Sequence, residues 1–138
     1  PRGILMQKIE RQILRIFLAT ILLSAALCMA SSDVCAVTCD MLVMNVDDAR
    51  TKLRRAANET DFEAAKDYAR RAKRALDDSA MSAMDCKCSM AHMEFDTASS
   101  YARRARNADT ADEFIASLNR AIRSFNAALN ALRACATE

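Results

Sequence analysis

Proline and glycine are almost absent from this sequence. Among its 138 residues the only proline is Pro1 and the only glycine is Gly3. Sheets joined by tight turns need glycine, proline or asparagine-glycine pairs at positions of special backbone geometry. A chain without them that is rich in alanine, arginine, leucine and methionine has the composition of helices. The sequence therefore predicts an all-α fold.

Groups that carry out catalysis are also scarce. His92 is the only histidine, and there is no glycine-rich loop. General acid–base pairs, Ser-His-Asp arrangements and phosphate-binding loops therefore lack their parts. The carboxylates are scattered among basic residues at helical spacing, which is typical of a solvated surface. We expect a protein that is not an enzyme.

The N-terminal segment has the pattern of a signal peptide. Residues 6–15 carry three positive charges, residues 16–30 are uncharged and mostly apolar, and small residues follow at the −3 and −1 positions of two cleavage sites. We expect residues 1–30 to be a signal peptide with translation starting at Met6. An uncleaved membrane anchor is the alternative, although fifteen helical residues span only about 22 Å. The expected location is periplasmic or secreted, or membrane-anchored with the domain outside the cytoplasm.

Removal of this segment changes the charge of the protein. The whole chain has a net charge of +2, whereas residues 31–138 hold 16 basic and 17 acidic residues, a net charge of −1. This near-neutral balance does not indicate a nucleic-acid partner, and it indicates membrane association only if the N-terminal segment is retained. Two clusters of arginine follow a tyrosine, Tyr68 and Tyr101, and are interpreted as a charged outer helix face.

The remaining sequence, the domain at 31–138, repeats itself after 49 residues. Repeat 39–86 matches repeat 88–135, with cysteines and methionines in register. The matched pairs include Cys39 with Cys88, Cys86 with Cys135, Met41 with Met90, and Met44 with Met93. A period of this length fits a unit of two helices and a turn. The sequence predicts two antiparallel hairpins that form a four-helix bundle or a short stack of hairpins.

Apolar residues at a spacing of three to four mark the buried face of each helix. Thr60-x-x-Glu63 and Thr110-x-x-Glu113 predict capping boxes where the second helix of each hairpin begins. The four expected seams are Leu42, Val46, Ala49, Leu53 and Ala56; Phe62, Ala65, Ala69, Ala72, Leu76, Ala80 and Ala83; Ala91, Phe95, Ala98, Ala102 and Ala105; and Ile115, Leu118, Ile122, Phe125, Leu129 and Leu132.

The cysteines predict disulfide staples, because small exported proteins often carry them. A hairpin brings the start of its first helix beside the end of its second, which favours Cys39–Cys86 and Cys88–Cys135. Counted at 1.5 Å per residue, however, the helix ends in the first repeat miss each other by roughly 9 Å. A nested pairing of Cys39–Cys86 with Cys35–Cys88 and a set of reduced thiols are the alternatives. In the favoured pairing Cys35 is free or bridges to a partner chain.

Methionine, cysteine and the single histidine gather where the repeats meet. Thioether, thiolate and imidazole are the ligands that suit Cu(I), and Met-x-x-Met places both sulfurs on one helix face. The candidate metal ligands are Met41, Met44, Met81, Met84, Cys86, Cys88, Met90, His92 and Met93. The other interpretation is a packing or partner surface, since methionine adapts to irregular apolar contacts. The sequence thus favours an exported scaffold for protein interaction, self-association or envelope structure, with copper binding as the alternative.

Overall fold

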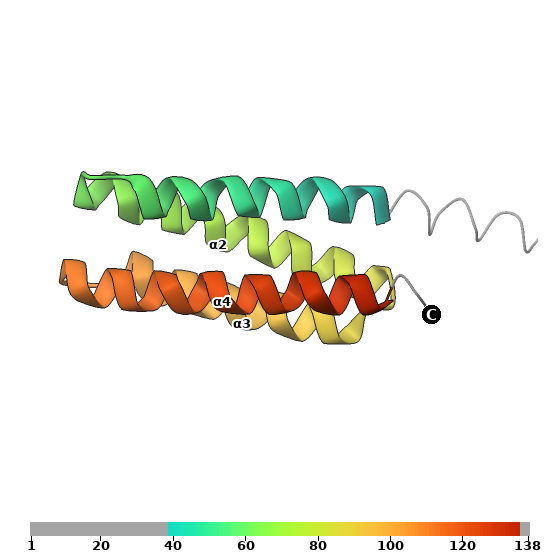
Figure 1. Cartoon of the computed structure of the whole chain (residues 1–138). Coiled ribbons are helices and arrows are strands. Elements are labelled where there is room, and N and C mark those ends of the chain that lie inside the picture. The colour runs from blue at the N-terminus through green and yellow to red at the C-terminus, as the bar shows by residue number, and fades with distance from the viewer. Residues whose placement is uncertain (1–38, 136–138) are drawn as a thin grey trace, which may run out of the picture. The chain divides into compact units, whose positions relative to one another are not determined.

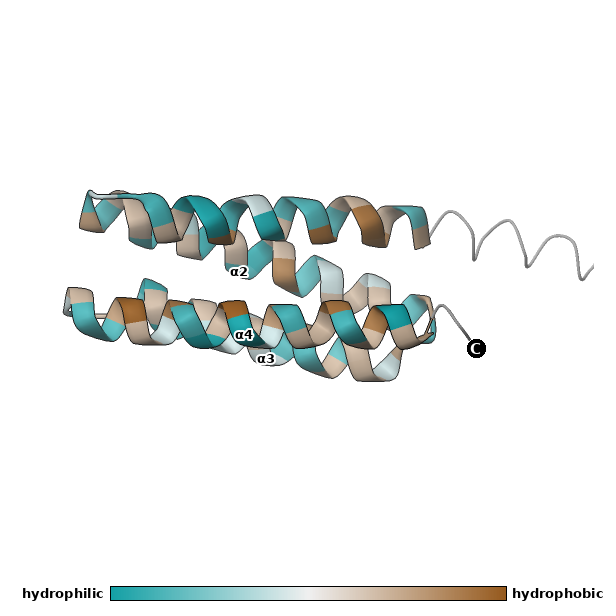
Figure 2. Cartoon of the chain, in the orientation of Figure 1, coloured by the Kyte–Doolittle hydropathy of each residue, from teal (hydrophilic) through white to brown (hydrophobic). Residues whose placement is uncertain are grey.

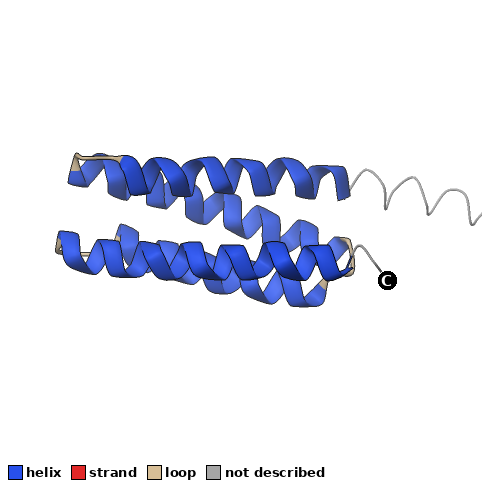
Figure 3. Cartoon of the chain, viewed as in Figure 1, coloured by secondary structure: helices blue, strands red, loops and turns tan. Residues whose placement is uncertain are grey.

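The protein is all-α, as the sequence predicts. The structure, a computed structural model, describes residues 39–135 and contains four helices and no strand in that range (Figure 3). The described part of the first helix covers residues 39–58, followed by α2 (Phe62–Asp85), α3 (Ser89–Arg106) and α4 (Ala111–Cys135). The first helix and α2 form one antiparallel hairpin, and α3 and α4 form the other (Figure 1). These hairpins coincide with the two sequence repeats.

The two hairpins share one core. Helix α3 packs against both α2 and α4. In the view of Figure 1, α2 and α3 lie behind the first helix and α4. The buried residues of all four helices belong to a single cluster. Hydrophilic and hydrophobic residues alternate along every helix in Figure 2, as expected of helices that each bury one face. The architecture is therefore a four-helix bundle made of two repeated hairpins.

Alanine dominates this core. Fifteen of its 23 buried apolar residues are alanine, and the largest fully buried side chains are Phe95, Leu76 and Ser79. Small side chains let helices approach closely but remove little apolar area from water, at about 25 cal/mol per Å². The bundle therefore gains less from burial than a leucine-rich bundle of the same length.

The predicted seams are confirmed in the first three helices, apart from a half-buried Phe62. In α4 the expected seam is wrong in part. Ile115 is 53% exposed, and Ile122, Leu129 and Leu132 are only half-buried. The observed core stripe of α4 is Phe114, Leu118, Ala121, Phe125 and Ala128. Alanine takes the contact positions because α3 and α4 pack closely, and the larger aliphatic side chains move to the flank.

The helix starts show one correction to the predicted capping boxes. The N-cap of α2 is Asp61, not Thr60, and its carboxylate accepts a hydrogen bond of 2.7 Å from the Ala64 amide. Asp is at least as good an N-cap as Thr, and α2 therefore begins one residue later than the predicted capping box. At α4 the Thr110 hydroxyl accepts from the Glu113 amide at 3.3 Å, and Glu113 reaches back to the Asp109 amide at 3.2 Å.

The turn between α2 and α3 is a Schellman motif without glycine. The amide of Cys88 donates to the Ala83 carbonyl and that of Lys87 to the Met84 carbonyl, each at 2.9 Å. Lys87 has φ of 62°, in the left-handed region that costs a residue with a Cβ about 1 kcal/mol.

Among residues 39–135, no helix is both long and apolar enough to cross a membrane.

Replacing Lys87 with glycine should stabilise the protein by about 1 kcal/mol, because glycine adopts this backbone conformation without strain. The two flanking disulfides limit the extra freedom that glycine would add to the unfolded chain. Denaturant unfolding of the oxidised protein measures the change. A Lys87→Ala variant is the control and should stay near wild type, since it keeps the Cβ. Equal stability of the two variants would contradict the assigned cost.

Candidate functional site

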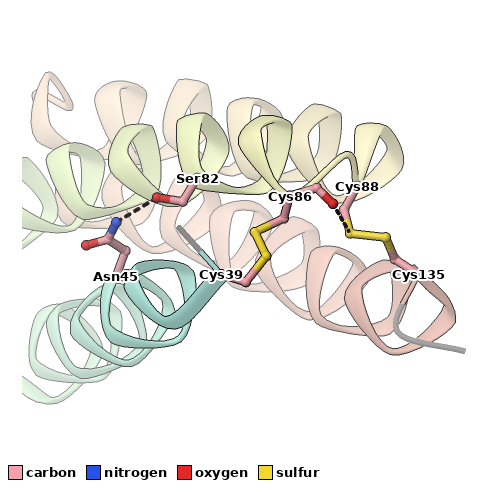
Figure 4. Close-up of a disulfide and its surroundings, with 6 residues drawn as sticks. All are labelled: Cys39, Asn45, Ser82, Cys86, Cys88 and Cys135. Atoms are coloured by element: carbon pink, nitrogen blue, oxygen red, sulfur yellow. Dashed lines mark hydrogen bonds between the residues drawn. A yellow bond between two sulfur atoms is a disulfide. The ribbon is translucent and has the colours of Figure 1, made fainter. Parts of the chain in front are cut away.

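Two disulfides close the end of the bundle where the repeats meet. Cys39 is bonded to Cys86 and Cys88 to Cys135, with Cα atoms 5.7 and 5.8 Å apart and a sequence separation of 47 in each (Figure 4). This is the repeat-symmetric pairing that the sequence favours. The nested alternative is not formed, because Cys88 is joined to Cys135 rather than to Cys35. Cys35 itself lies outside the described residues.

The course of α2 explains how the first disulfide forms despite unequal helix lengths. Helix α2 runs obliquely across the first helix from the loop end to the disulfide end (Figure 1). An oblique helix covers less distance along the bundle than its length, so Cys86 arrives beside Cys39. The misfit of roughly 9 Å was calculated for helix axes that run side by side without crossing. Because the axis of α2 is inclined to that of the first helix, the two cysteines meet.

A partly buried polar contact joins the first helix to α2 close to this disulfide. Nδ2 of Asn45 donates to the Ser82 hydroxyl at 3.0 Å and, more weakly, to the Asp78 carbonyl at 3.4 Å (Figure 4). Ser82 is buried, so this bond replaces a hydrogen bond to water that folding removes. The disulfide end is therefore held both covalently and by a specific polar contact.

Six exposed methionines surround the two disulfides, and we call this region the methionine end. Each of the first three helices contributes two of them near its disulfide-bonded terminus, and their exposure ranges from 54 to 72%. Methionine is an apolar residue that usually fills gaps in a core, yet here the core contains alanine and the methionines face outward. The six are Met41, Met44, Met81, Met84, Met90 and Met93.

A groove lies beside the methionine end between the first helix and the end of α4. It has a volume of about 860 Å³, and Val43, Met44 and Leu132 provide much of its apolar lining. Both disulfides also border it. Val43 is 69% exposed, which is unusual for a β-branched apolar residue on a helix. Met44 lines the groove, and the other five methionines are exposed at the same end of the bundle, so apolar side chains remain uncovered there in the described part of the chain.

Acidic side chains surround this apolar surface. Asp40, Asp85 and Asp96 are exposed, and none of them forms an ion pair with another described residue. Asp47 and Asp48 border the groove, where each pairs only with a lysine or arginine of its own helix. The methionine end therefore presents apolar area within an acidic rim, in which three carboxylates are unpaired within the described range and Arg50 and Lys87 are nearby cations.

His92 lies at the seam between α2 and α3. Its Nδ1 forms a hydrogen bond of 2.9 Å with the Ala80 carbonyl, so Nδ1 carries the proton of the neutral ring and Nε2 keeps a lone pair. This is the tautomer found in metal-binding histidines. Met84 follows Ala80 by one helical turn on the same side of α2. The other predicted ligands, Cys86 and Cys88, have no thiolate in this form, and no group of three His, Cys, Asp or Glu side chains that could hold a metal occurs among residues 39–135.

Sequence reasoning found the cysteines, methionines and histidine of this region but missed the groove. The predicted seam of α4 counts Leu132 as a core residue because it was placed one step around the helix, and Val43 belongs to no predicted seam. A signal was present in the alanines of α4, which mark the close contact with α3 and turn Leu132 toward the flank.

Two disulfides in a domain of this size indicate an oxidising compartment outside the cytosol. Comparisons with protein-family models, curated proteins and solved structures find no match for this chain.

Proposed function

We propose that this protein is an exported, non-enzymatic module that binds another protein through its methionine end. The observation that carries the proposal is the exposure of six methionines at one end of the bundle, one of which, Met44, also lines the groove, on a scaffold whose own core is built largely from alanine. Contiguous exposed apolar surface on a soluble domain marks an interaction site. Two disulfides hold the ends of all four helices together, which reduces the entropy lost when a partner binds.

The chemistry of the surface selects the kind of partner. Methionine side chains are flexible and polarisable, and they adapt to varied apolar surfaces. The acidic rim attracts positive charge. The partner that fits both features is an amphipathic helical segment with large apolar residues on one face and lysine or arginine beside them.

Replacing Met44 and Met93 together with glutamine should weaken binding of a synthetic leucine–lysine amphipathic peptide about tenfold, at about 0.7 kcal/mol for each lost apolar contact. Both side chains are exposed, so the fold should be unaffected. Calorimetric titration of the oxidised protein measures the affinity. Ile115→Gln is the matched control, because Ile115 is 53% exposed, close to the 55% of Met93, but lies at the start of α4, far from the methionine end. Equal weakening in the control, or no saturable binding by wild type, would refute the proposal.

A second candidate function is binding of Cu(I) by thioethers together with His92. The observation in its favour is the His92 tautomer, which leaves the lone pair of Nε2 available to a metal. Thioethers are poor zinc ligands, so we expect Cu(I) uptake without Zn(II) uptake. His92→Ala should abolish high-affinity Cu(I) binding, and replacing a thioether, as in Met84→Leu, should weaken it. Native mass spectrometry reads the bound metal, and absence of Cu(I) after titration would exclude this function.

A further inference from the structure

Each hairpin holds two arginines against one tyrosine ring, away from the methionine end. In the second hairpin the Cζ atoms of Arg104 and Arg120 lie 5.3 and 5.9 Å from the centre of the Tyr101 ring. In the first hairpin Arg55 and Arg71 both lie 5.8 Å from the ring of Tyr68. Stacking on an aromatic ring orients a guanidinium group and leaves its N–H donors directed to the side.

The arginine pairs correspond in the repeat, whereas the tyrosines do not. Arg55 and Arg104 are 49 residues apart, and so are Arg71 and Arg120. The ring, however, comes from α2 in the first hairpin and from α3 in the second. In both hairpins, two repeat-related arginines therefore contact one tyrosine ring, although the tyrosine comes from a different helix in each.

The first hairpin provides its own anion for this arrangement. Nε and Nη2 of Arg71 both lie 2.7 Å from one carboxylate oxygen of Asp67. Hydrogen bonds from Arg70 and Arg71 lower the pKa of Asp67, so this carboxylate stays charged. The donors of Arg71 are therefore already occupied by a negative group of the protein.

The second hairpin lacks that anion. The residue 49 positions after Asp67 is Ala116, so no carboxylate is placed beside Arg120. Arg104 and Arg120 are exposed, and the guanidinium group of neither forms an ion pair or hydrogen bond with another residue in the described range 39–135. The hydroxyl of Tyr101 has no hydrogen-bond partner there either. The side chains of Arg104, Arg120 and Tyr101 therefore bring several hydrogen-bond donors together without an acceptor from the described part of the protein.

We propose that Arg104, Tyr101 and Arg120 form a binding site for a phosphate or sulfate group, in which an external oxyanion takes the role that Asp67 has in the first hairpin. A tetrahedral oxyanion offers several acceptor oxygens to two guanidinium groups and a phenol. The site is independent of the methionine end, because Arg104 and Tyr101 belong to the last two turns of α3, close to the loop that connects it to α4. The group can come from free phosphate or from a phospholipid head group.

The first test uses inorganic phosphate, followed by NMR of the arginine side-chain N–H signals in the purified oxidised protein. We expect one saturable site per chain, weakened about tenfold by Arg104→Gln with Arg120→Gln. Arg74→Gln with Arg123→Gln is the matched control, since those arginines are also exposed and repeat-related but contact no ring. Equal weakening in both double variants, or no saturable site, would overturn the proposal.

The second test exchanges the internal anion between the hairpins. Ala116→Asp should fill the second site with a carboxylate and abolish phosphate binding, whereas Asp67→Ala should open the first site and raise the stoichiometry from one to two. No effect of Ala116→Asp on binding would overturn the proposal. Sedimentation with vesicles of equal parts phosphatidylglycerol and phosphatidylcholine distinguishes the sources. Vesicle binding that inorganic phosphate competes away supports a lipid head group, and phosphate binding without vesicle binding supports a soluble anion.

Discussion

Replacing Cys88 and Cys135 together with alanine should lower the free energy of unfolding by about 4 kcal/mol. The disulfide spans a sequence separation of 47, and closing a loop of that length removes much of the freedom of the unfolded chain. The loss is large relative to the 5–15 kcal/mol that typically stabilises a domain, and the alanine-rich core has little to offset it. Guanidinium unfolding of the oxidised variant and wild type measures the difference.

The repeat provides a built-in control for this prediction. Replacing Cys39 and Cys86 with alanine should cost a similar amount, because that loop has the same sequence separation. In a reducing buffer the wild type should lose the stabilisation of both disulfides, and the difference between it and each variant should shrink. A loss of less than about 1 kcal/mol in oxidising buffer would show that the disulfides do not stabilise the fold as the chain-entropy argument requires.

Replacing Phe95 with alanine should destabilise the protein by about 4 kcal/mol. Phe95 has 0% exposure, is the largest fully buried side chain, and packs against Phe125 with ring centres 6.0 Å apart. Its neighbours are largely alanines, which are too short to fill the cavity that the substitution creates. Thermal and denaturant unfolding measure the loss.

Ile115→Ala is the control for the Phe95 prediction. Ile115 is 53% exposed on the flank of α4, so truncating it should change stability by no more than about 0.5 kcal/mol. Similar losses at the two positions would contradict the placement of α4. They would restore the seam through Ile115 and Ile122 that the sequence alone suggests.

The fold was predictable because its signals are periodic and repeated. The near-absence of glycine and proline indicates helices, and the 49-residue repeat divides them into hairpins. The register of Cys39 with Cys88 and of Cys86 with Cys135 then favours the disulfide pairs. The seam of α4 was not predictable by hydrophobicity alone. Alanine and isoleucine both count as apolar, but only the close contact of α3 and α4 decides that Ala121 is buried and Ile115 is exposed.

The candidate sites were predictable only in part. The sequence identified the methionines as candidate metal ligands or as a packing or partner surface, and the structure leaves all six of the described range exposed. The groove depends on how the first helix and α4 are positioned in space, which no local pattern encodes. The tyrosine–arginine clusters looked like an ordinary charged face. The structure shows that Arg104 and Arg120, 16 residues apart, contact the same tyrosine ring. Because no carboxylate lies beside them as Asp67 lies beside Arg71, we interpret the cluster as a binding site for an anion.

The central claim is that the methionine end binds a basic amphipathic segment. NMR of the oxidised protein with isotopically labelled methionine methyl groups tests it most directly, because all six methionines of the described range belong to this surface. Titration with the leucine–lysine peptide should shift signals of Met41, Met44, Met81, Met84, Met90 and Met93 along one saturable curve. The Tyr101 ring signals should stay unchanged. Unmoved methionine signals at peptide saturation, or shifts spread equally to Tyr101, would contradict the account.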